Sequence, residues 1–139
     1  MDQARAIEAL TYSGATNQAL EREHQTIENA IELISEAVLS NAAPTTVACL
    51  LDMLVTFCES HFTSEEQHLN DRGYRDSHNH AVAHKGLLKL FCGARTAASD
   101  GLLDSTGEIS ILLDGFRVHI DQFDKPAHAS LSLASSAAL

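Results

Sequence analysis

The sequence contains no tryptophan, only two prolines and few aromatic residues, which make up 5% of the chain. Because proline breaks helices while alanine and leucine favour them, a chain this poor in proline and rich in alanine and leucine is typical of a helical protein. Basic residues are also scarce: 9 Lys and Arg stand against 19 Asp and Glu, a formal net charge of −10. Nucleic acid and anionic lipid repel such a chain, so we expect no nucleic acid and no membrane as partners.

Cysteine is scarce and irregularly placed. Cys49, Cys58 and Cys92 are odd in number and form no C-x-x-C pair, which favours reduced thiols over a disulfide framework. The first residues contain no apolar segment of the kind found in signal peptides, and no run of 18 apolar residues occurs in the chain. We therefore expect a soluble, cytoplasmic protein.

Apolar residues recur every three or four positions in four segments of the chain, the pattern of amphipathic helices. A chain of 139 residues is long enough to bury one hydrophobic core. We expect an all-α fold, an antiparallel up-down-up-down four-helix bundle with an N-terminal arm, formed by residues 1–126. The small and polar residues 127–139 are expected to form a flexible tail or linker. The predicted helices cover residues 20–39, 45–70 and 77–99, and a fourth begins at a capping box, Ser105 to Glu108.

Two pairs of metal-binding side chains flank the turn between the second and third predicted helices. His61 and Glu65 are four residues apart, as are His80 and His84, and a step of four places both members of a pair on one helix face. Imidazole together with carboxylate suits zinc, iron, copper or manganese, whereas calcium and magnesium require oxygen ligands. One such pair alone commonly lies on a solvated helix face. Whether these residues bind a metal therefore depends on what the other helices contribute.

Every predicted helix carries a potential metal ligand on its apolar face. Burying these polar groups without partners would cost about 2 kcal/mol or more each, which argues for a shared metal. If two carboxylates and a solvent oxygen bridge two metals, each metal receives three bridging ligands. His80, His84 and His119 then bring one metal to six ligands, and His24 and His61 bring the other to five. This arrangement fits paired iron best and manganese next, but it does not say whether dioxygen is carried, sensed or consumed. The seven residues are His24, His61, Glu65, His80, His84, His119 and Asp124.

The interval between His119 and Asp124 does not fit a regular helix. The two residues are five apart, which separates their side chains by about 140° around an ideal α-helix. A π-bulge, which inserts one residue into a turn, would bring the two side chains together, and such bulges are frequent at functional sites. The sequence therefore predicts a π-bulge between His119 and Asp124.

Five sequence motifs contain the seven residues. They are His24 in EREHQTI, HFxxEE from His61 to Glu66, GYxxxxxH from Gly73 to His80, HxxxH at His80 and His84, and HxxxxD from His119 to Asp124. Taken together, these motifs resemble the hemerythrin family, specifically the bacterial hemerythrin domains, over about residues 11–126. The resemblance implies a di-iron centre bridged by Glu65, Asp124 and an oxo or hydroxo group. It also implies reversible dioxygen binding at the five-coordinate iron held by His24 and His61, inside a dry pocket.

Some positions depart from the family pattern. Asp121 stands where the family usually has an aliphatic residue near the dioxygen pocket, and it is a candidate ligand-binding residue. Pointing inward it would enter the pocket and favour peroxide chemistry; pointing outward it would be a solvated charge. His68, one turn beyond Glu65, is either a partner of the metal ligands or a histidine at the wet end of the bundle. We expect His78 and His128 on the surface.

Three functions are compatible with the sequence. The first is reversible dioxygen binding at a non-haem di-iron centre, by an oxygen carrier, store or sensor domain that is not an enzyme. A sensor would act on a fused or separate signalling output domain. The second is a di-iron peroxidase or oxidase, or a nitric oxide or redox sensor, with Asp121 in the ligand pocket. The third is a purely structural bundle with incidental histidines.

Overall fold

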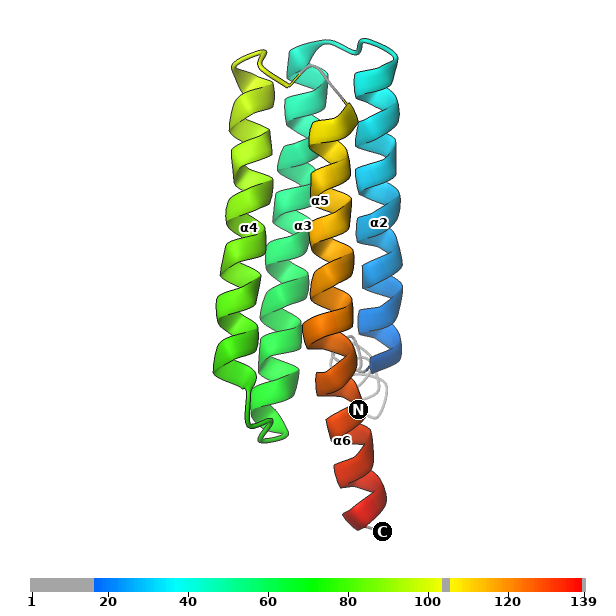
Figure 1. Ribbon diagram of the computed structural model, residues 1–139, viewed down its shortest axis with the longest axis vertical. Helices are drawn as coiled ribbons and strands as arrows, with labels where there is room; N and C mark the ends of the chain where they lie inside the picture. Colours follow the sequence, from blue (N-terminus) through cyan, green and yellow to red (C-terminus); the bar gives the residue numbers. More distant parts are fainter. Residues whose placement is uncertain (1–16, 104–105, 139) are drawn as a thin grey trace, which may run out of the picture.

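A computed structural model describes residues 17–103 and 106–138, and four long helices form its body. They are α2 (Asn17–Leu39), α3 (Pro44–Asp71), α4 (Ser77–Ser99) and α5 (Thr106–His119). The helices lie side by side, and consecutive helices run in opposite directions (Figure 1). The described residues contain no strand, so the predicted all-α bundle is confirmed. The expected N-terminal arm and Ser105 of the expected capping box lie outside the described residues.

Residues with special backbone preferences mark the ends of the helices. Pro44 opens α3, where the missing N–H of proline is not needed. Gly73 and Gly101 follow α3 and α4 with φ angles of 68° and 70°, a left-handed conformation that glycine adopts at little cost. Asn41 follows α2 with a φ angle of 58°. The first three predicted helices therefore agree with the structure to within one turn.

Charged residues on their outer faces keep the bundle helices from being apolar on all sides. The longest helix, α3, has 28 residues, enough to cross a bilayer if they were apolar, but exposed residues such as Asp52 and Glu59 interrupt it. Within the two described ranges, no helix is both long enough and apolar enough to span a membrane.

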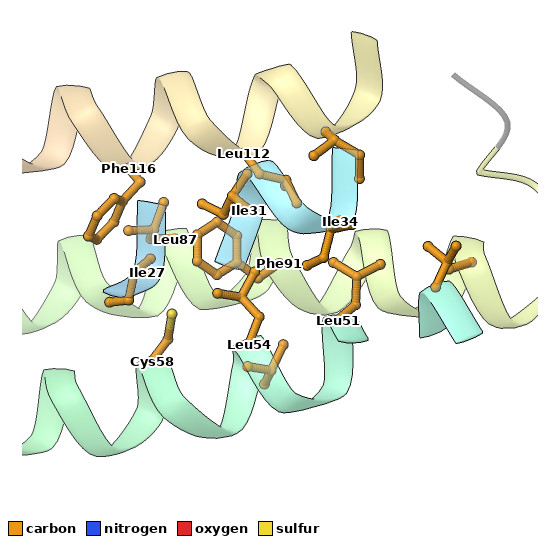
Figure 2. Close-up of a cluster of buried hydrophobic side chains, with 14 of the residues drawn as sticks. Ile27, Ile31, Ile34, Leu51, Leu54, Cys58, Leu87, Phe91, Leu112 and Phe116 are labelled. Carbon is orange, nitrogen blue, oxygen red and sulfur yellow. The ribbon is translucent and has the colours of Figure 1, made fainter. Parts of the chain in front are cut away.

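Hydrocarbon side chains fill the half of the bundle that lies away from the turn between α3 and α4 (Figure 2). Ile31, Leu54 and Phe91 in this core are at most 2% exposed, and burying each such side chain stabilises the fold by about 1.5–3 kcal/mol. Cys58 is also fully buried, and burial raises the pKa of its thiol to about 12. This thiol therefore acts as a small apolar side chain, and all three cysteines of the chain are free.

Beyond α5 the chain continues as a π-helical segment, η2 (Ile120–Asp124), and then as α6 (Lys125–Ala138). Figure 1 shows α6 projecting past the end of the bundle. The expected flexible tail, residues 127–139, is therefore helical as far as Ala138, because Pro126 falls in the first turn of α6, where helices tolerate proline. Its first turn packs on the bundle, with Ala127 fully buried, whereas Leu133 is 72% exposed.

Candidate metal centre

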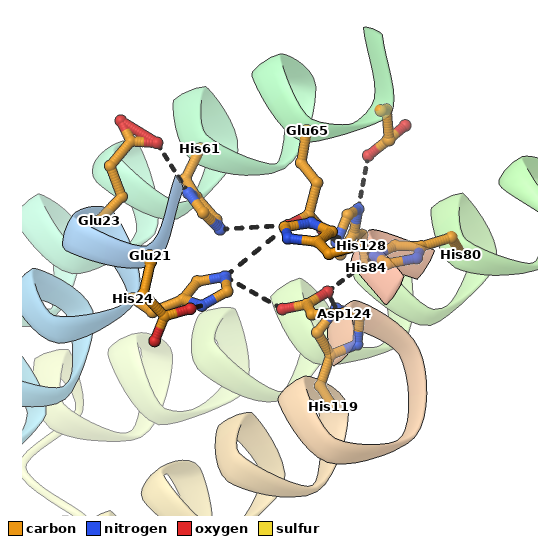
Figure 3. A network of polar contacts seen from close by, with 11 residues as sticks. Glu21, Glu23, His24, His61, Glu65, His80, His84, His119, Asp124 and His128 are labelled. Atoms are coloured by element: carbon orange, nitrogen blue, oxygen red, sulfur yellow. Dashed lines mark hydrogen bonds and ion pairs between the residues drawn. The ribbon is translucent and has the colours of Figure 1, made fainter. Parts of the chain in front are cut away.

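Seven buried polar residues converge in the half of the bundle that ends at the α3–α4 turn. All seven are those singled out from the sequence, and each is at most 4% exposed. Figure 3 shows their side chains pointing toward one another from different helices. Helix α2 supplies His24, α3 supplies His61 and Glu65, α4 supplies His80 and His84, α5 supplies His119 and η2 supplies Asp124.

The two oxygens of Glu65 face two different groups of histidines. Its Oε1 lies 2.7 Å from Nε2 of His80 and 3.0 Å from Nε2 of His84. Its Oε2 lies 3.7 Å from Nε2 of His24 and 3.9 Å from Nε2 of His61. Glu65 therefore stands between a pair of histidines from α4 and a pair from α2 and α3.

Asp124 divides its contacts in the same way. Its Oδ1 lies 2.8 Å from Nε2 of His80 and 3.0 Å from Nε2 of His119. Its Oδ2 lies 3.0 Å from Nε2 of His24. The two carboxylates thus each offer one oxygen to a three-histidine side, formed by His80, His84 and His119, and one oxygen to a two-histidine side, formed by His24 and His61.

The π-helical segment explains how Asp124 reaches the centre. The backbone N–H of Lys125 donates to the carbonyl of Ile120, five residues earlier, whereas an α-helix uses a spacing of four. The wider turn brings His119 and Asp124 onto one face, with the 3.0 Å contact given above. The π-bulge predicted from the sequence is therefore confirmed.

The donor atoms fit a pair of metal ions. Nε2 of His61, Oε2 of Glu65 and both carboxylate oxygens of Asp124 are buried and have no hydrogen-bond partner among the described residues, a costly state that metal ions would relieve. Bonds from metals to nitrogen and oxygen are about 2 Å long, so two ligands of one ion lie about 3–4 Å apart. The contacts of the two carboxylates, from 2.7 to 3.9 Å, match that range.

The carboxylates and imidazoles of the centre shift one another's pKa. Burial alone lowers the pKa of His24, but the carboxylates of Asp124 and Glu65 outweigh burial and raise this pKa to about 10. His80 shows the same balance, and its pKa rises to about 9. Burial alone raises the pKa of Glu65 and of Asp124, yet the surrounding imidazoles hold both well below the usual range. Without metal, the imidazoles of His24 and His80 are therefore protonated beside the two carboxylates.

Outer carboxylates contact three of the five histidine rings, and two of these contacts are hydrogen bonds. Glu23 Oε1 lies 2.9 Å from Nδ1 of His61, and Glu66 Oε2 lies 2.8 Å from Nδ1 of His84. Glu21 makes a longer contact of 3.3 Å with Nδ1 of His24. A carboxylate on Nδ1 fixes the ring so that Nε2 points at the centre, and raises its strength as a ligand.

No pattern in the sequence predicted a role for these outer carboxylates. Glu21 and Glu23 belong to the polar side of their helix, and Glu66 was noted only as part of the HFxxEE motif. The available signal is that all three lie within one turn of a ligand residue in the sequence. The contact of Glu23 with a histidine of a different helix could not be read from that spacing, because it depends on how α2 and α3 pack.

Aromatic rings pack against the histidines of the centre, and two of them, Phe62 and Phe116, belong to the hydrophobic core. Phe62 stacks on His84 with 4.2 Å between ring centroids and an interplanar angle of 10°. Phe123 stacks on His119 at 5.3 Å and 17°, and Phe116 meets His24 edge-on at 5.8 Å. Because Phe62 and Phe116 are at most 2% exposed, these two rings separate the ligands they contact from water.

Asp121 does not enter the centre. Its side chain is 65% exposed, and Oδ1 lies 2.7 Å from Nζ of Lys125. Asp121 is two residues from His119, and a step of two turns a helical side chain by about 200°, away from the ligand. Its neighbour Ile120 is the residue that packs against the core. Of the two orientations considered from the sequence, the structure has the outward one, and the inward role in the ligand pocket is not supported.

His128 was expected at the surface and His68 either beside the metal ligands or at the wet end of the bundle, and both are buried or nearly so. His68 is 4% exposed. The side chain of His128 is 15% exposed, and its Nε2 lies 3.6 Å from Oε2 of Glu65. His78, by contrast, is exposed, as expected. The sequence did carry one signal for His128, which lies four residues beyond Asp124, but using it required knowing that a helix continues past Pro126.

Comparison with protein families agrees with this geometry. The family model described as hemerythrin HHE cation binding domain matches residues 15–126, a range that contains all seven converging residues. Comparisons with curated proteins and with solved structures gave no significant match. Since the matched range covers most of the chain, the protein belongs to the hemerythrin HHE cation-binding family.

Proposed function

We propose that the chain holds two iron ions and binds dioxygen reversibly, as an oxygen carrier, store or sensor domain. The observation that carries the proposal is the division of both carboxylates between two groups of histidines. Counting one oxygen from each carboxylate, the three-histidine side has five protein donors and the two-histidine side has four. The unequal sides leave more coordination room on the ion held by His24 and His61.

The chemistry of the donors supports iron. Mixed imidazole and carboxylate ligands with an unfilled position are typical of non-haem iron sites that meet dioxygen, whereas structural zinc takes four ligands in a closed tetrahedron. A pair of ferrous ions, when bound, supplies the two electrons that reversible dioxygen binding requires. The protein's contribution is to hold the ligands and to control what reaches them.

The residues around the two-histidine side favour reversible binding over further reaction. His24 and His61 meet the aromatic rings of Phe116 and Phe62, respectively, and Ile27, one turn after His24 on α2, is fully buried. These side chains carry no proton donor and exclude water from the core side. On this core side, aprotic side chains would slow the oxidation of bound iron.

The test is the optical spectrum of the reduced, iron-loaded full-length protein before and after exposure to air. We expect about two iron ions per chain, since both sides hold four or more donors, and a spectrum that changes in air and returns when dioxygen is removed. Rapid and irreversible conversion to the oxidised form would overturn reversible binding. Recovery of less than about one iron per chain after anaerobic loading would favour a purely structural bundle.

The rival proposals, a di-iron peroxidase or oxidase and a nitric oxide or redox sensor, drew on Asp121 as a group in the ligand pocket. Its exposed carboxylate pairs with Lys125, so Asp121 supplies these rivals with neither a proton donor nor an extra ligand inside the centre. Turnover of hydrogen peroxide by the iron-loaded protein, measured beside the air-exposure experiment, separates these activities from simple dioxygen binding.

A further inference from the structure

His128 lies beside the metal centre although it was expected on the surface. It is carried by the first turn of α6, four residues after Asp124, so both side chains project from the same face of that segment. Its side chain is 15% exposed, and the preceding Ala127 is fully buried. Figure 3 shows the ring of His128 in front of the Glu65 carboxylate.

The contact of His128 is with Oε2 of Glu65, the oxygen whose imidazole neighbours lie farther away. Oε1 of Glu65 has imidazole nitrogens at 2.7 and 3.0 Å, whereas Oε2 has three imidazole nitrogens, all at longer distances. His128 is the nearest of the three at 3.6 Å, ahead of His24 at 3.7 Å and His61 at 3.9 Å. Oε2 is also buried without a hydrogen-bond partner among the described residues.

A second histidine contacts the ring of His128. His68 on α3 is 4% exposed, and its ring meets that of His128 edge-on, with centroids 6.3 Å apart. Glu65 and His68 are three residues apart on α3, and so share one face of that helix. His128 therefore occupies a slot between Glu65 and His68 at the end of the bundle.

We propose that His128 is a positioning residue of the metal centre, whose Nε2–H donates to Oε2 of Glu65 when the metals are bound. The contact is longer than a hydrogen bond, and an approach of about 0.6 Å would bring it to the usual length. A carboxylate oxygen has two lone pairs, so Oε2 can accept from His128 and still face His24 and His61. Held in this way, Glu65 keeps the orientation in which its two oxygens serve two different metals.

This role comes from a part of the chain outside the matched family segment. The match ends at residue 126, and His128 reaches Glu65 only because α6 continues the helix beyond it. The inference rests on the proposed function, because it assumes that Glu65 bridges two metal ions. It adds that the residues after the family segment complete the metal site.

The test compares His128→Leu, which removes the donor, with His128→Gln, whose side-chain amide can still donate. The same two substitutions at the exposed His78 are the matched controls. The rate at which a chelator removes ferrous iron under anaerobic conditions is measured for each full-length variant, after circular dichroism has shown that it remains helical. We expect His128→Leu to release iron about tenfold faster than the parent protein. His128→Gln should restore most of the loss, and the His78 variants should match the parent.

Two results would overturn the role of His128. Release from His128→Leu at the parent rate would show that the contact does not hold Glu65. Equal loss in His128→Gln and His128→Leu would point to direct ligation by the imidazole or to packing alone. Zinc also binds imidazole and carboxylate and undergoes no redox change. If the iron-loaded protein fails to bind dioxygen, the release rates of the same variants can therefore still be compared with zinc in the site. Failure of the proposed function and failure of this inference are thereby distinguishable.

Discussion

Nε2 of His24 lies 3.0 Å from Oδ2 of Asp124, so the first bundle helix and the segment after the last one meet at the same site. Glu65 on α3 and His80 on α4 complete the ring of donors around this contact, so every helix of the bundle contributes to the site. Metal binding and folding should therefore be strongly coupled, with the metals stabilising the native state by their binding free energy.

Removing either shared carboxylate should empty both metal positions. Glu65→Gln and Asp124→Asn keep the size of the side chains but remove the charge that both sides share. We expect each variant to retain less than about half of the parent's metal, whereas His24→Ala should lose mainly the metal of the two-histidine side. Metal analysis of anaerobically loaded protein measures this, with Cys58→Ser as a control, since that thiol lies in the hydrophobic core. Full metal content in Glu65→Gln would contradict the bridging assignment.

Replacing Asp121 should leave the metal centre unchanged. Its carboxylate is exposed and paired with Lys125, so Asp121→Leu removes only a solvent-screened surface ion pair. The lifetime of the air-exposed form and the peroxide turnover of Asp121→Leu should agree with the parent within about twofold, or about 0.4 kcal/mol in the barrier. A change of tenfold or more in either measurement would show that Asp121 does reach the bound ligand.

Loss of an outer carboxylate should weaken metal binding without abolishing it. Glu23→Gln replaces the charged partner of His61 Nδ1, and Glu66→Gln does the same for His84. Such substitutions typically cost about 10- to 100-fold in metal affinity. Competition with a chelator of known affinity measures the loss. The control is Glu32→Gln, because Glu32 is exposed and lies away from the centre on α2, and an equal loss there would mean that only the overall charge matters.

The metal-free protein should become less stable as pH rises above neutral. The folded-state pKa of His24, about 10, and that of His80, about 9, lie above the ordinary value of 6.5. A raised pKa means that the folded state binds the proton more tightly. The resulting stabilisation is complete below pH 6.5 and disappears as pH rises through about 9 to 10. Denaturant unfolding of the metal-free protein at pH 6.5, 8 and 10 should give a falling free energy of unfolding.

The same pKa values predict proton release when metal binds. At pH 8 the imidazoles of His24 and His80 are largely protonated in the metal-free protein, and both must lose the proton to act as ligands. Adding metal in weak buffer should therefore release about two protons per chain. His24→Gln should release about one fewer than the parent protein. Equal proton release from the two would show that His24 is neutral before metal binds.

The helices and the seven central residues could be predicted from the sequence because both depend on local periodicity. The positions of His61 and Glu65, and of His80 and His84, fix each pair to one helix face whatever the rest of the chain does. The interval of five between His119 and Asp124 likewise requires a local change of helix geometry, and the structure provides it as η2.

Other features were decided by packing between elements, which periodicity does not contain. The outward direction of Asp121, the burial of His68 and the contact of Glu23 with His61 depend on how each helix is rotated against its neighbours. His128 reaches Glu65 because α6 follows the π-helical turn and continues beyond Pro126. By itself the sequence determined which residues share a helix face. Only the tertiary structure decided which faces meet, because that depends on the rotation and register of helices whose contacts are distant in the chain.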